Sequence, residues 1–429
     1  MKIRRIDTDR ASLEAFFSSN QADQRSYEAS VDQIAEAVRA RGEAAIFELT
    51  AKFDGPLLTA ETFLVSPSEV AEAYAIVGEE YLASLSKAIS NINAFHERQL
   101  KNSWMETDDH GNILGQMYQP MERVGIYVPG GTAAYPSSVL MNAIPALVAG
   151  VSEIAMVSPP DKNGGMNPYT LVAAAELGIT EIYKVGGAQA IFMLGWGTEH
   201  VRKVDLISGP GNIYVTLAKK KVYGDCNIDM LAGPSEILII ADESADASHL
   251  AADLMSQAEH DVLARCVLVT DQEDLLEEVE DELSRQIKDL SRRDIIEKSL
   301  EQYGAFVLVN DMKEACEVSN LFAPEHLELV VEQPFDLLSR IRHAGAIFMG
   351  KYTPEPLGDY LAGPNHILPT GGTARFYSPV TVDTFMKTCS LLYYTREGFF
   401  NDAADAIRLA EVEGLTAHAN SIRVRMRKG

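Results

Sequence analysis

Residues 124–132 read Val-Gly-Ile-Tyr-Val-Pro-Gly-Gly-Thr, an apolar run followed directly by a glycine-rich turn, and a helix is expected to begin near Ser137. A strand, a tight turn and a helix in this order are the opening of a βαβ unit. From residue 123 onward, short apolar runs alternate with segments long enough to form helices. This alternation predicts an α/β protein with mainly parallel sheet.

Strand-length apolar runs recur through the rest of the chain. We expect strands at Val124–Val128, Ile154–Val157, Ile182–Val185, Val204–Ile207, Ile237–Ile240, Val267–Val269, Phe306–Val309, Leu327–Val331 and Ala346–Met349. These are many strands for one sheet in a chain of 429 residues, so two α/β domains are expected. A boundary near Ala232-Gly233-Pro234 fits this division.

The two ends of the chain have helical character. Apolar residues repeat at helical spacing from Val31 to Val38, and residues 26–102 are expected to be helical. Ser66-Pro67-Ser68-Glu69 combines an N-cap serine, a proline at the first helical position and a capping-box glutamate. This predicts a long helix from there to about residue 100. Residues 379–429 are expected to be a mostly helical appendage.

Composition excludes several classes of protein. The formal net charge is −25, and such an acidic surface repels phosphate backbones, so nucleic acid is not an expected partner. No apolar stretch is long enough to span a bilayer, and no signal peptide is evident, so we expect no membrane partner and a cytoplasmic location. The four cysteines are scattered without a CxxC pair, which argues against a disulfide framework and a thiolate zinc site.

Two glycine-rich turns follow predicted strands. One is residues 129–132, and the other is Gly209-Pro210-Gly211-Asn212. Such turns let backbone N–H groups approach a phosphate at a helix N-terminus. Neither matches G-x-G-x-x-G, because Tyr214 occupies the position of the third glycine. Dinucleotide binding and a tight turn without a ligand both remain open.

Four of the nine histidines lie in polar segments of the second half of the chain. These segments are residues 256–261, 324–326, 358–366 and 413–418. Histidine binds divalent metals and moves protons near neutral pH, and here it recurs with Gln, Asp and Glu. The recurrence indicates a metal-assisted active site gathered from distant segments.

The first of these segments offers a pair of metal-ligand candidates. Gln257 and His260 are three residues apart in a predicted helix, so their side chains lie on one face. Histidine, aspartate and an amide oxygen form a suitable nitrogen and oxygen ligand set for zinc or a similar ion. A solvated polar helix face would give the same pattern.

The other segments contain candidate acids and bases. Glu325 and His326 precede a predicted strand, where adjacent side chains point in different directions, so a histidine base and a water-activating carboxylate would have separate tasks. A surface ion pair at the strand start is the alternative. Glu355 and Asp359 flank a turn that is typical of a binding loop. His366 follows at another turn, and each of these residues could instead be structural.

His418 lies among small residues near the end of the chain, in the segment Gly414-Leu415-Thr416-Ala417-His418. These small neighbours would allow another surface to pack closely. A metal ligand and a surface histidine in a helical tail are equally compatible with this pattern.

Together these segments resemble the histidinol dehydrogenase family over nearly the whole chain. The motifs that carry the resemblance, in order, are Gly125-Ile126-Tyr127-Val128-Pro129-Gly130-Gly131, Tyr135-Pro136-Ser137-Ser138, Val185-Gly186-Gly187-Ala188-Gln189-Ala190, Gly209-Pro210-Gly211-Asn212, Ala232-Gly233-Pro234-Ser235-Glu236, Ser256-Gln257-Ala258-Glu259-His260, Ala323-Pro324-Glu325-His326, Gly358-Asp359-Tyr360, Gly363-Pro364-Asn365-His366 and Glu413-Gly414-Leu415-Thr416-Ala417-His418. One departure is Leu231, where the family pattern has proline, and this could shift the Ser235 loop.

The resemblance implies a zinc ion in each subunit, a nicotinamide cofactor and a homodimer with shared active sites. The zinc ligands it implies are Gln257, His260, Asp359 and His418, the last from the partner subunit. The L-histidinol contacts it implies are Ser235, His326, Glu413 and the metal ligands. The NAD contacts it implies are Tyr127, Gln189 and Asn212.

The resemblance also implies two incomplete Rossmann-like domains with parallel sheets. Residues 1–25 would be an N-terminal helical segment. Residues 26–122 and 236–378 would form the first α/β domain, with the zinc and catalytic residues. Residues 123–235 would form the second, NAD-binding domain, and residues 379–429 would be a helical C-terminal dimerisation segment.

The reaction implied by the resemblance is oxidation of L-histidinol to L-histidine by two NAD⁺, through an aldehyde. Zinc would orient the substrate, His326 would take the alcohol proton, and Glu325 would activate the water that hydrates the aldehyde. Two other classes of protein would use the same ligands without NAD. They are a zinc hydrolase and a non-catalytic assembly protein stabilised by metal.

Overall fold

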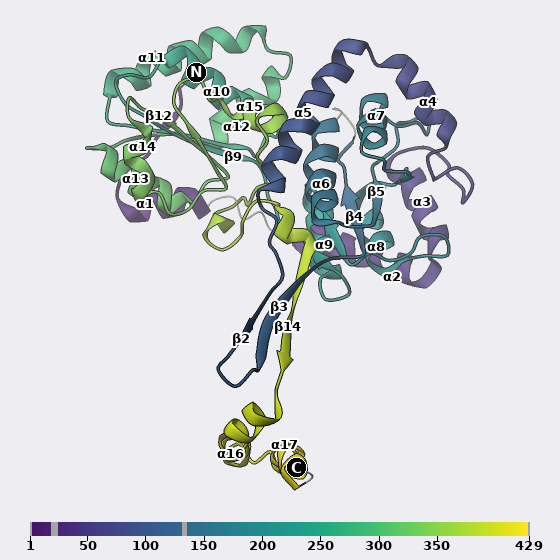
Figure 1. The fold of residues 1–429 in the computed structure, drawn as a ribbon. Helices are drawn as coiled ribbons and strands as arrows, with labels where there is room; N and C mark the ends of the chain where they lie inside the picture. Colours follow the sequence, from purple (N-terminus) through teal and green to yellow (C-terminus); the bar gives the residue numbers. More distant parts are fainter. Residues whose placement is uncertain (1, 19–24, 131–134, 428–429) are drawn as a thin grey trace. The chain divides into compact units, whose positions relative to one another are not determined.

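The computed structural model describes residues 2–18, 25–130 and 135–427. The chain forms two compact units. The larger unit comprises Met1–Gln99 and Met121–Phe385, and the smaller unit comprises Leu100–Pro120 and Met386–Gly429. In the described residues the larger unit contains two parallel sheets, and the smaller unit contains an antiparallel sheet (Figure 1).

The first sheet of the larger unit is parallel throughout. Its strands lie in the order β1 (Arg4–Arg5), β11 (Gly304–Leu308), β10 (Arg265–Thr270), β9 (Glu236–Ala241), β12 (His326–Val330) and β13 (Ala346–Met349). The pairing of β1 with β11 places the N-terminal segment at one edge of this sheet. That segment was expected to be helical, and it contains a short strand before its helix.

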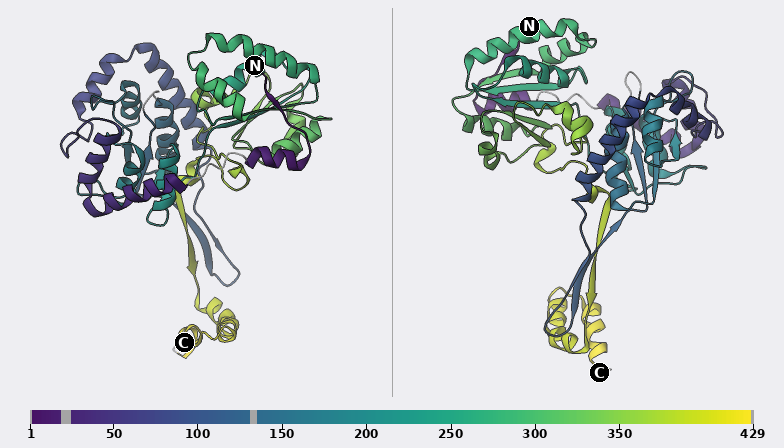
Figure 2. Two further views of the ribbon diagram at one scale, coloured as in Figure 1. Left: turned by 180° about the vertical axis from the view of Figure 1, so that it is seen from behind. Right: turned by 45° about the horizontal axis from the view of Figure 1, so that its top comes forward.

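Helices cover both faces of the first sheet (Figure 2). Ile237 and Ile239 face the helices α10 (Ala247–Ala258), α11 (Glu273–Gln286) and α12 (Arg293–Tyr303). Leu238 and Ile240 face the helices α1 (Arg10–Ser18), α13 (Met312–Phe322) and α14 (Pro334–Leu337). Alternate residues of β9 are thus buried in opposite cores, which explains the continuous apolar run in its sequence.

The second sheet of the larger unit is also parallel. Its strands lie in the order β6 (Glu181–Tyr183), β5 (Glu153–Val157), β4 (Arg123–Tyr127), β7 (Leu206–Ser208) and β8 (Asn227–Ile228). The helices that share a hydrophobic core with it are α2 (Arg25–Arg41), α3 (Glu43–Phe53), α8 (Gly187–Trp196) and α9 (Ile213–Val222). The helices α6 (Pro136–Ala149) and α7 (Pro168–Glu176) pack together beside it.

The assignment of residues 26–122 to the first α/β domain is wrong for the helices α2 and α3. Val31 and Val38 of α2 and Ile46 of α3 are buried in the core of the second sheet. The helical spacing of these residues showed which face is buried. It did not show which sheet buries that face, because periodicity contains no information on the partner.

The capping box at Ser66 is confirmed, whereas the expected single long helix is two helices. Ser66 Oγ accepts from Glu69 N–H at 3.3 Å, and Glu69 Oε2 accepts from Ser66 N–H at 2.8 Å. The helix α4 (Pro67–Ile76) ends before Val77, and α5 (Glu79–Glu97) begins after Gly78. Val77 and Gly78 both have extended backbone, so the helical path is interrupted there.

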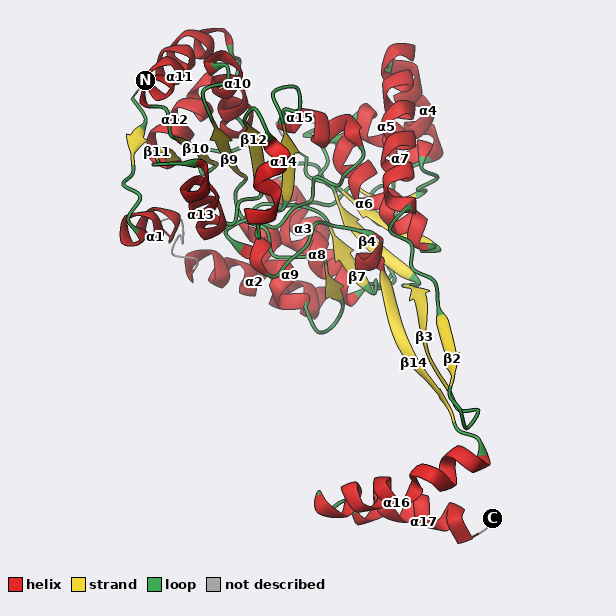
Figure 3. Ribbon diagram, turned by 60° about the vertical axis from the view of Figure 1, so that its left-hand side comes forward, coloured by secondary structure: helices red, strands yellow, loops and turns green. Residues whose placement is uncertain are grey.

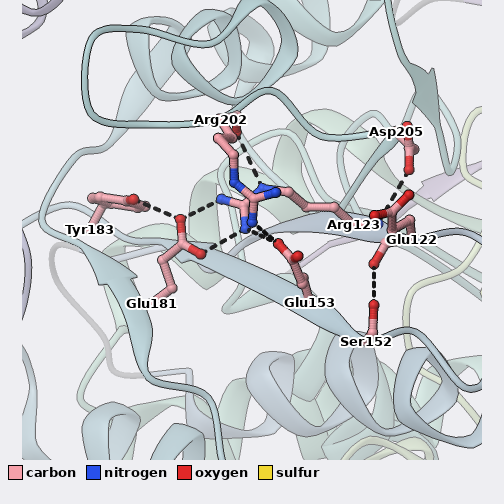
Figure 4. Close-up of polar contacts among 8 residues, drawn as sticks. All are labelled: Glu122, Arg123, Ser152, Glu153, Glu181, Tyr183, Arg202 and Asp205. Carbon is pink, nitrogen blue, oxygen red and sulfur yellow. Dashed lines mark hydrogen bonds and ion pairs between the residues drawn. The ribbon is translucent and has the colours of Figure 1, made fainter.

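A polar cluster joins the amino-terminal ends of three strands of the second sheet (Figure 4). The buried Arg123 of β4 binds Glu153 of β5, with Nη1 and Oε2 2.9 Å apart, and it also binds both oxygens of Glu181 of β6. Tyr183 Oη donates to Glu181 Oε1 at 2.7 Å. The cluster therefore fixes the relative register of three neighbouring strands.

The smaller unit was not predicted as a sheet. It contains β2 (Trp104–Thr107), β3 (Ile113–Pro120) and β14 (Met386–Tyr393), which pair antiparallel in the order β14-β3-β2 (Figure 3). The helices α16 (Arg396–Val412) and α17 (Thr416–Arg427) follow. The expectation of a mostly helical segment over 379–429 is correct only after β14. The strand was missed because β14 pairs with β3, which is so distant in sequence that the pairing leaves no local signal.

All the strands predicted from apolar runs are confirmed, with ends shifted by a few residues. Strand-length runs between helices identified them because both faces of the two parallel sheets are buried. In the described part of the chain, no helix combines the length and the apolarity needed to cross a bilayer.

Candidate active site

Three of the four polar clusters, those at residues 256–261, 324–326 and 358–366, meet at the amino-terminal ends of the strands of the first sheet. Glu236 begins β9 and His326 begins β12. The helix α10 runs back from the end of β9 toward the start of β10, so Gln257 at its end and His260 just beyond it reach the same edge. The connection between parallel strands explains why residues distant in sequence meet here.

Three of these side chains form a group that could hold a metal ion. Ligand atoms of His260, Glu355 and Asp359 lie within 4.8 Å of one another. Glu355 belongs to the short helix α15 (Glu355–Leu357), and Asp359 lies in the helical turn Gly358–Ala362. Asn91 Nδ2 donates to the carbonyl of Leu361 at 2.9 Å and so holds this turn from α5.

Gln257 is fully buried, and neither its Oε1 nor its Nε2 has a hydrogen-bond partner in the described residues. Buried side-chain amides are almost always hydrogen-bonded, and leaving one unpaired is costly. His260 lies in the turn just beyond α10, and its N–H donates to the Gln257 carbonyl at 3.2 Å. The amide of Gln257 is therefore available to a ligand at this position.

His326 is buried, and its ring is oriented by the backbone. Nδ1 lies 3.0 Å from the carbonyl oxygen of Glu236, which accepts a hydrogen bond from it. Nε2 has no hydrogen-bond partner in the described residues, and it lies 3.8 Å from Glu355 Oε1 and 4.0 Å from Asp359 Oδ1. Burial lowers the pKa of His326, which leaves Nε2 as an unprotonated acceptor.

Glu325 is closer to His326 than an extended chain would place it. Glu325 Oε2 lies 3.6 Å from His326 Nδ1 and accepts from Glu236 N–H at 2.8 Å. Glu325 precedes the strand and follows Ala323, whose φ of 54° turns the chain. Glu325 thus lies beside the Nδ1 edge of the His326 ring, while the Nε2 edge faces Glu355. Burial raises the pKa of Glu325 well above its usual value.

Glu355 is a site residue to which the sequence assigned no role. It is buried, and its Oε1 has no hydrogen-bond partner in the described residues. Burial raises the pKa of Glu355 to about 10, and the negative charge of Asp359 contributes in the same direction. The spacing of four residues between Glu355 and Asp359 was the available signal, because it places two carboxylates on one face of a helical turn.

The residues expected to bind NAD lie at the carboxyl-terminal ends of the strands of the second sheet. Tyr127 ends β4, and its hydroxyl accepts from Gly187 N–H at 3.2 Å. Gln189 is buried in the first turn of α8. Asn212 caps α9, with its Oδ1 accepting from the N–H groups of Tyr214 and Val215. This edge of a parallel sheet is where α/β folds bind ligands.

Backbone geometry at Gly209 explains the second glycine-rich turn. Its φ is 126°, and a Cβ there would lie 2.1 Å from the carbonyl oxygen of Tyr127. Asp229 Oδ2 accepts from Gly209 N–H at 2.8 Å, and the buried Lys219 donates to the Gly209 carbonyl at 3.0 Å. The turn is rigid and requires glycine. In the other turn, Gly131 and Thr132 lie outside the described residues.

The remaining expected site residues are divided between the two units. Ser235 is half-buried beside the first sheet, and its carbonyl oxygen accepts from Arg265 N–H at 3.0 Å. The adjoining Leu231 is also half-buried. His366 Nδ1 donates to the carbonyl of Asp359 at 3.1 Å, which supports the turn that contains Asp359. Glu413 and His418 are exposed residues of the smaller unit.

Comparisons with known proteins agree on one family. A sequence model of the histidinol dehydrogenase family matches residues 17–426. The histidinol dehydrogenase of Heliobacterium mobile is 56% identical over 398 residues, which are 93% of each chain. That of Bacillus subtilis strain 168 is 51% identical over 429 residues, covering 100% of this chain and 99% of the relative.

A solved structure agrees with the sequence comparisons. The crystal structure of histidinol dehydrogenase from Elizabethkingia anophelis matches this chain with a TM-score of 0.93 and 36% identity. The match covers 99% of this chain and 98% of the other. The likeness thus includes the strands, turns and helix ends on which the candidate site residues lie.

Proposed function

The chain belongs to the histidinol dehydrogenase family, and from this premise we propose that it oxidises L-histidinol to L-histidine in two successive hydride transfers to NAD⁺. The single observation that best supports the chemistry is the imidazole of His326. Its Nδ1 donates to a backbone carbonyl, while its Nε2, which has no hydrogen-bond partner among the described residues, lies 3.8 Å from Glu355 Oε1 and 4.0 Å from Asp359 Oδ1. A proton acceptor therefore lies beside a possible metal site.

The donor set fits a zinc ion. Gln257, His260 and Asp359 offer amide oxygen, imidazole nitrogen and carboxylate oxygen, which suit Zn²⁺. The unpaired buried amide of Gln257 supports this assignment, because a ligand would satisfy it. Zinc would supply a template for the imidazole and amino nitrogens of the substrate, and NAD⁺ would supply the hydride acceptor. We propose His418 of the partner subunit as the fourth protein ligand.

His326 acts as the general base in both oxidations. Its Nε2 takes the proton from the substrate hydroxyl while the hydride leaves the carbon that bears this hydroxyl, which gives the aldehyde. The hydrogen bond from Nδ1 to the Glu236 carbonyl keeps Nδ1 protonated, so Nε2 presents its lone pair. After hydration of the aldehyde, the same nitrogen takes a hydroxyl proton of the hydrate in the second transfer.

Glu325 activates the water that hydrates the aldehyde. A buried carboxylate is a stronger base than an exposed one, because burial disfavours its charge. The hydrogen bond from Glu236 N–H orients one oxygen. The other oxygen is then the atom that takes a proton from water as the hydroxyl adds to the aldehyde carbon.

The second sheet offers the nucleotide site. Tyr127, Gln189 and Asn212 come from three different strand ends, and hydrogen bonds fix Tyr127 and Asn212. Gly209 has no room for a Cβ, and its N–H and carbonyl are bonded to Asp229 and Lys219, so the turn before α9 has a fixed backbone path. Ser235 and Glu413 complete the proposed substrate contacts, with Glu413 contributed across a homodimer that works in the cytoplasm.

The proposed function is tested by following NADH. The purified protein, given L-histidinol and NAD⁺, should form two NADH for each histidinol consumed. Chelation should abolish turnover and leave the far-UV circular dichroism spectrum unchanged, because the ligands belong to elements that are already packed. A zinc hydrolase or an assembly protein would form no NADH. Unfolding on chelation would show instead that the metal is structural.

A further inference from the structure

Glu236 contacts both proposed catalytic side chains through its backbone. Its N–H donates to Glu325 Oε2 at 2.8 Å, and its carbonyl oxygen accepts from His326 Nδ1 at 3.0 Å. One residue at the start of β9 therefore orients the carboxylate of Glu325 and determines that the imidazole of His326 is protonated on Nδ1. A shift of this residue would misplace both groups.

The side chain of Glu236 is buried and has anchors of its own. Its Oε2 accepts from Gly371 N–H at 3.0 Å, and its Oε1 lies 3.8 Å from Arg265 Nη1. Arg265 faces Glu236 across the pairing of β9 with β10. The guanidinium lies 5.4 Å from the ring centre of Phe16 and 5.8 Å from that of Phe322.

Arg265 is an unusual residue to find in this core. It is 2% exposed, and its Nε and Nη2 have no hydrogen-bond partner within the described ranges. Its Nη1 donates to the carbonyl of Phe17 at 2.8 Å, and the structure records no ion pair for it there other than the one with Glu236. A buried ion pair contributes little to the net free energy of folding. A contribution to stability therefore does not by itself explain the presence of this pair.

We propose that Glu236 is a positioning residue for the oxidation, held in place by Arg265. The inference rests on the proposed function, which assigns Glu325 and His326 their roles. The backbone of Arg265 also contacts the loop before β9, because its N–H donates to the Ser235 carbonyl at 3.0 Å. The pair thus connects the base, the water-activating carboxylate and the loop before β9.

The test compares Glu236→Gln with the wild type. Gln retains the shape of the side chain and removes its charge, so Arg265 loses its partner. We expect kcat for histidinol oxidation to fall by about 10- to 100-fold, as for other residues that orient catalytic groups. The KM for NAD⁺ should stay at the wild-type value, because the proposed nucleotide residues lie on the second sheet.

Glu181→Gln is the matched control. It removes the charge of a carboxylate bound to another buried arginine, Arg123, at the amino-terminal ends of the second sheet (Figure 4). This control should lower the melting temperature and leave kcat unchanged. If Glu236→Gln also keeps the wild-type kcat, the positioning role is wrong.

A double variant separates positioning from stability. Glu236→Gln combined with Arg265→Met removes both charges, and replacement of a whole buried pair is often neutral for stability. We expect this double variant to regain stability and keep the low kcat. Arg265→Lys alone, which keeps the positive charge beside Glu236, should keep part of the wild-type activity. Recovery of the wild-type kcat in the double variant would show that the pair is merely structural.

A second readout does not depend on turnover. In protein with ¹⁵N-labelled histidine, NMR should show His326 protonated on Nδ1, and this signal should weaken or broaden in Glu236→Gln. If wild-type protein forms no NADH, the proposed function fails. If the His326 signal is the same in both proteins, the positioning inference fails.

Discussion

Two atoms of one imidazole have different environments at the candidate site. His326 Nδ1 is bound to a backbone carbonyl, whereas Nε2 faces Glu355 and Asp359 without a hydrogen-bond partner in the described residues. Histidine in a polar segment could be recognised from the sequence as a candidate base. The nitrogen that acts could not, because the neighbouring carbonyl comes from β9, ninety residues away.

At the residue scale we predict that Glu325 and His326 have separable roles. His326→Asn removes the base and should slow both oxidations by roughly 10²–10⁴-fold. Glu325→Gln should spare the oxidation of histidinol to the aldehyde and slow the oxidation of added histidinal, because only the second step needs hydration. Stopped-flow measurement of NADH with each substrate distinguishes the two steps.

The control for this pair is His200→Asn, which changes an exposed histidine that binds Glu43 beside the second sheet. It should leave both steps unchanged. Equal losses for histidinol and histidinal in Glu325→Gln would contradict the assignment of that residue to water activation.

At the scale of elements, buried charge ties together strands that local sequence only located. Although burial acts to raise it, hydrogen bonds from Arg123 and Tyr183 hold the pKa of Glu181 below its usual value of 4.5. A carboxylate whose pKa is lowered in the folded state stabilises the protein at pH values above the usual pKa. This contribution is lost as the pH falls through the folded-state pKa.

We predict that Arg123→Met destabilises the larger unit and changes its response to acid. Removing one partner of a buried pair typically costs 3–5 kcal/mol, and about 3 kcal/mol is expected here because Glu153 and Glu181 are about one third exposed. Urea unfolding at neutral pH measures this loss. Below pH 4.5 the difference from wild type should shrink, and a difference independent of pH would contradict the ionic explanation.

At the scale of the whole molecule, the proposed site requires residues from both units. The larger unit contains Gln257, His260 and Asp359, while Glu413 and His418 belong to the smaller unit. Within the larger unit, the proposed catalytic side chains come from amino-terminal strand ends of one sheet, and the proposed nucleotide residues come from carboxyl-terminal strand ends of the other. The homodimer with shared active sites that the family resemblance implies motivates the proposal of a shared site.

We predict that inactive chains complement each other in mixed dimers. His326→Ala chains and His418→Ala chains are each expected to be inactive. If His418 serves the partner subunit, a mixed dimer has one site with both defects and one intact site, by the symmetry of the dimer. Mixing under conditions of subunit exchange should restore NADH formation. Background activity after native mass spectrometry confirms exchange would show that His418 serves its own chain.

The sequence by itself determined the α/β class, the strands of both parallel sheets and the polar segments of the site. It could do so because strand-length apolar runs, caps and glycine turns depend on local chemistry. The family motifs then supplied the expected ligands, Gln257, His260 and Asp359 among them, and the structure brings the last two together.

Only the tertiary structure decided which sheet buries α2, how β14 pairs with β3, and what surrounds His326. The contacts of Glu236 and Glu355 with the neighbouring side chains also emerged only there. All of these features depend on contacts between segments that are far apart in the chain, or on the burial of an ionisable group by such contacts. Local spacing shows that a face is buried or a group can ionise, and only folding determines its partner.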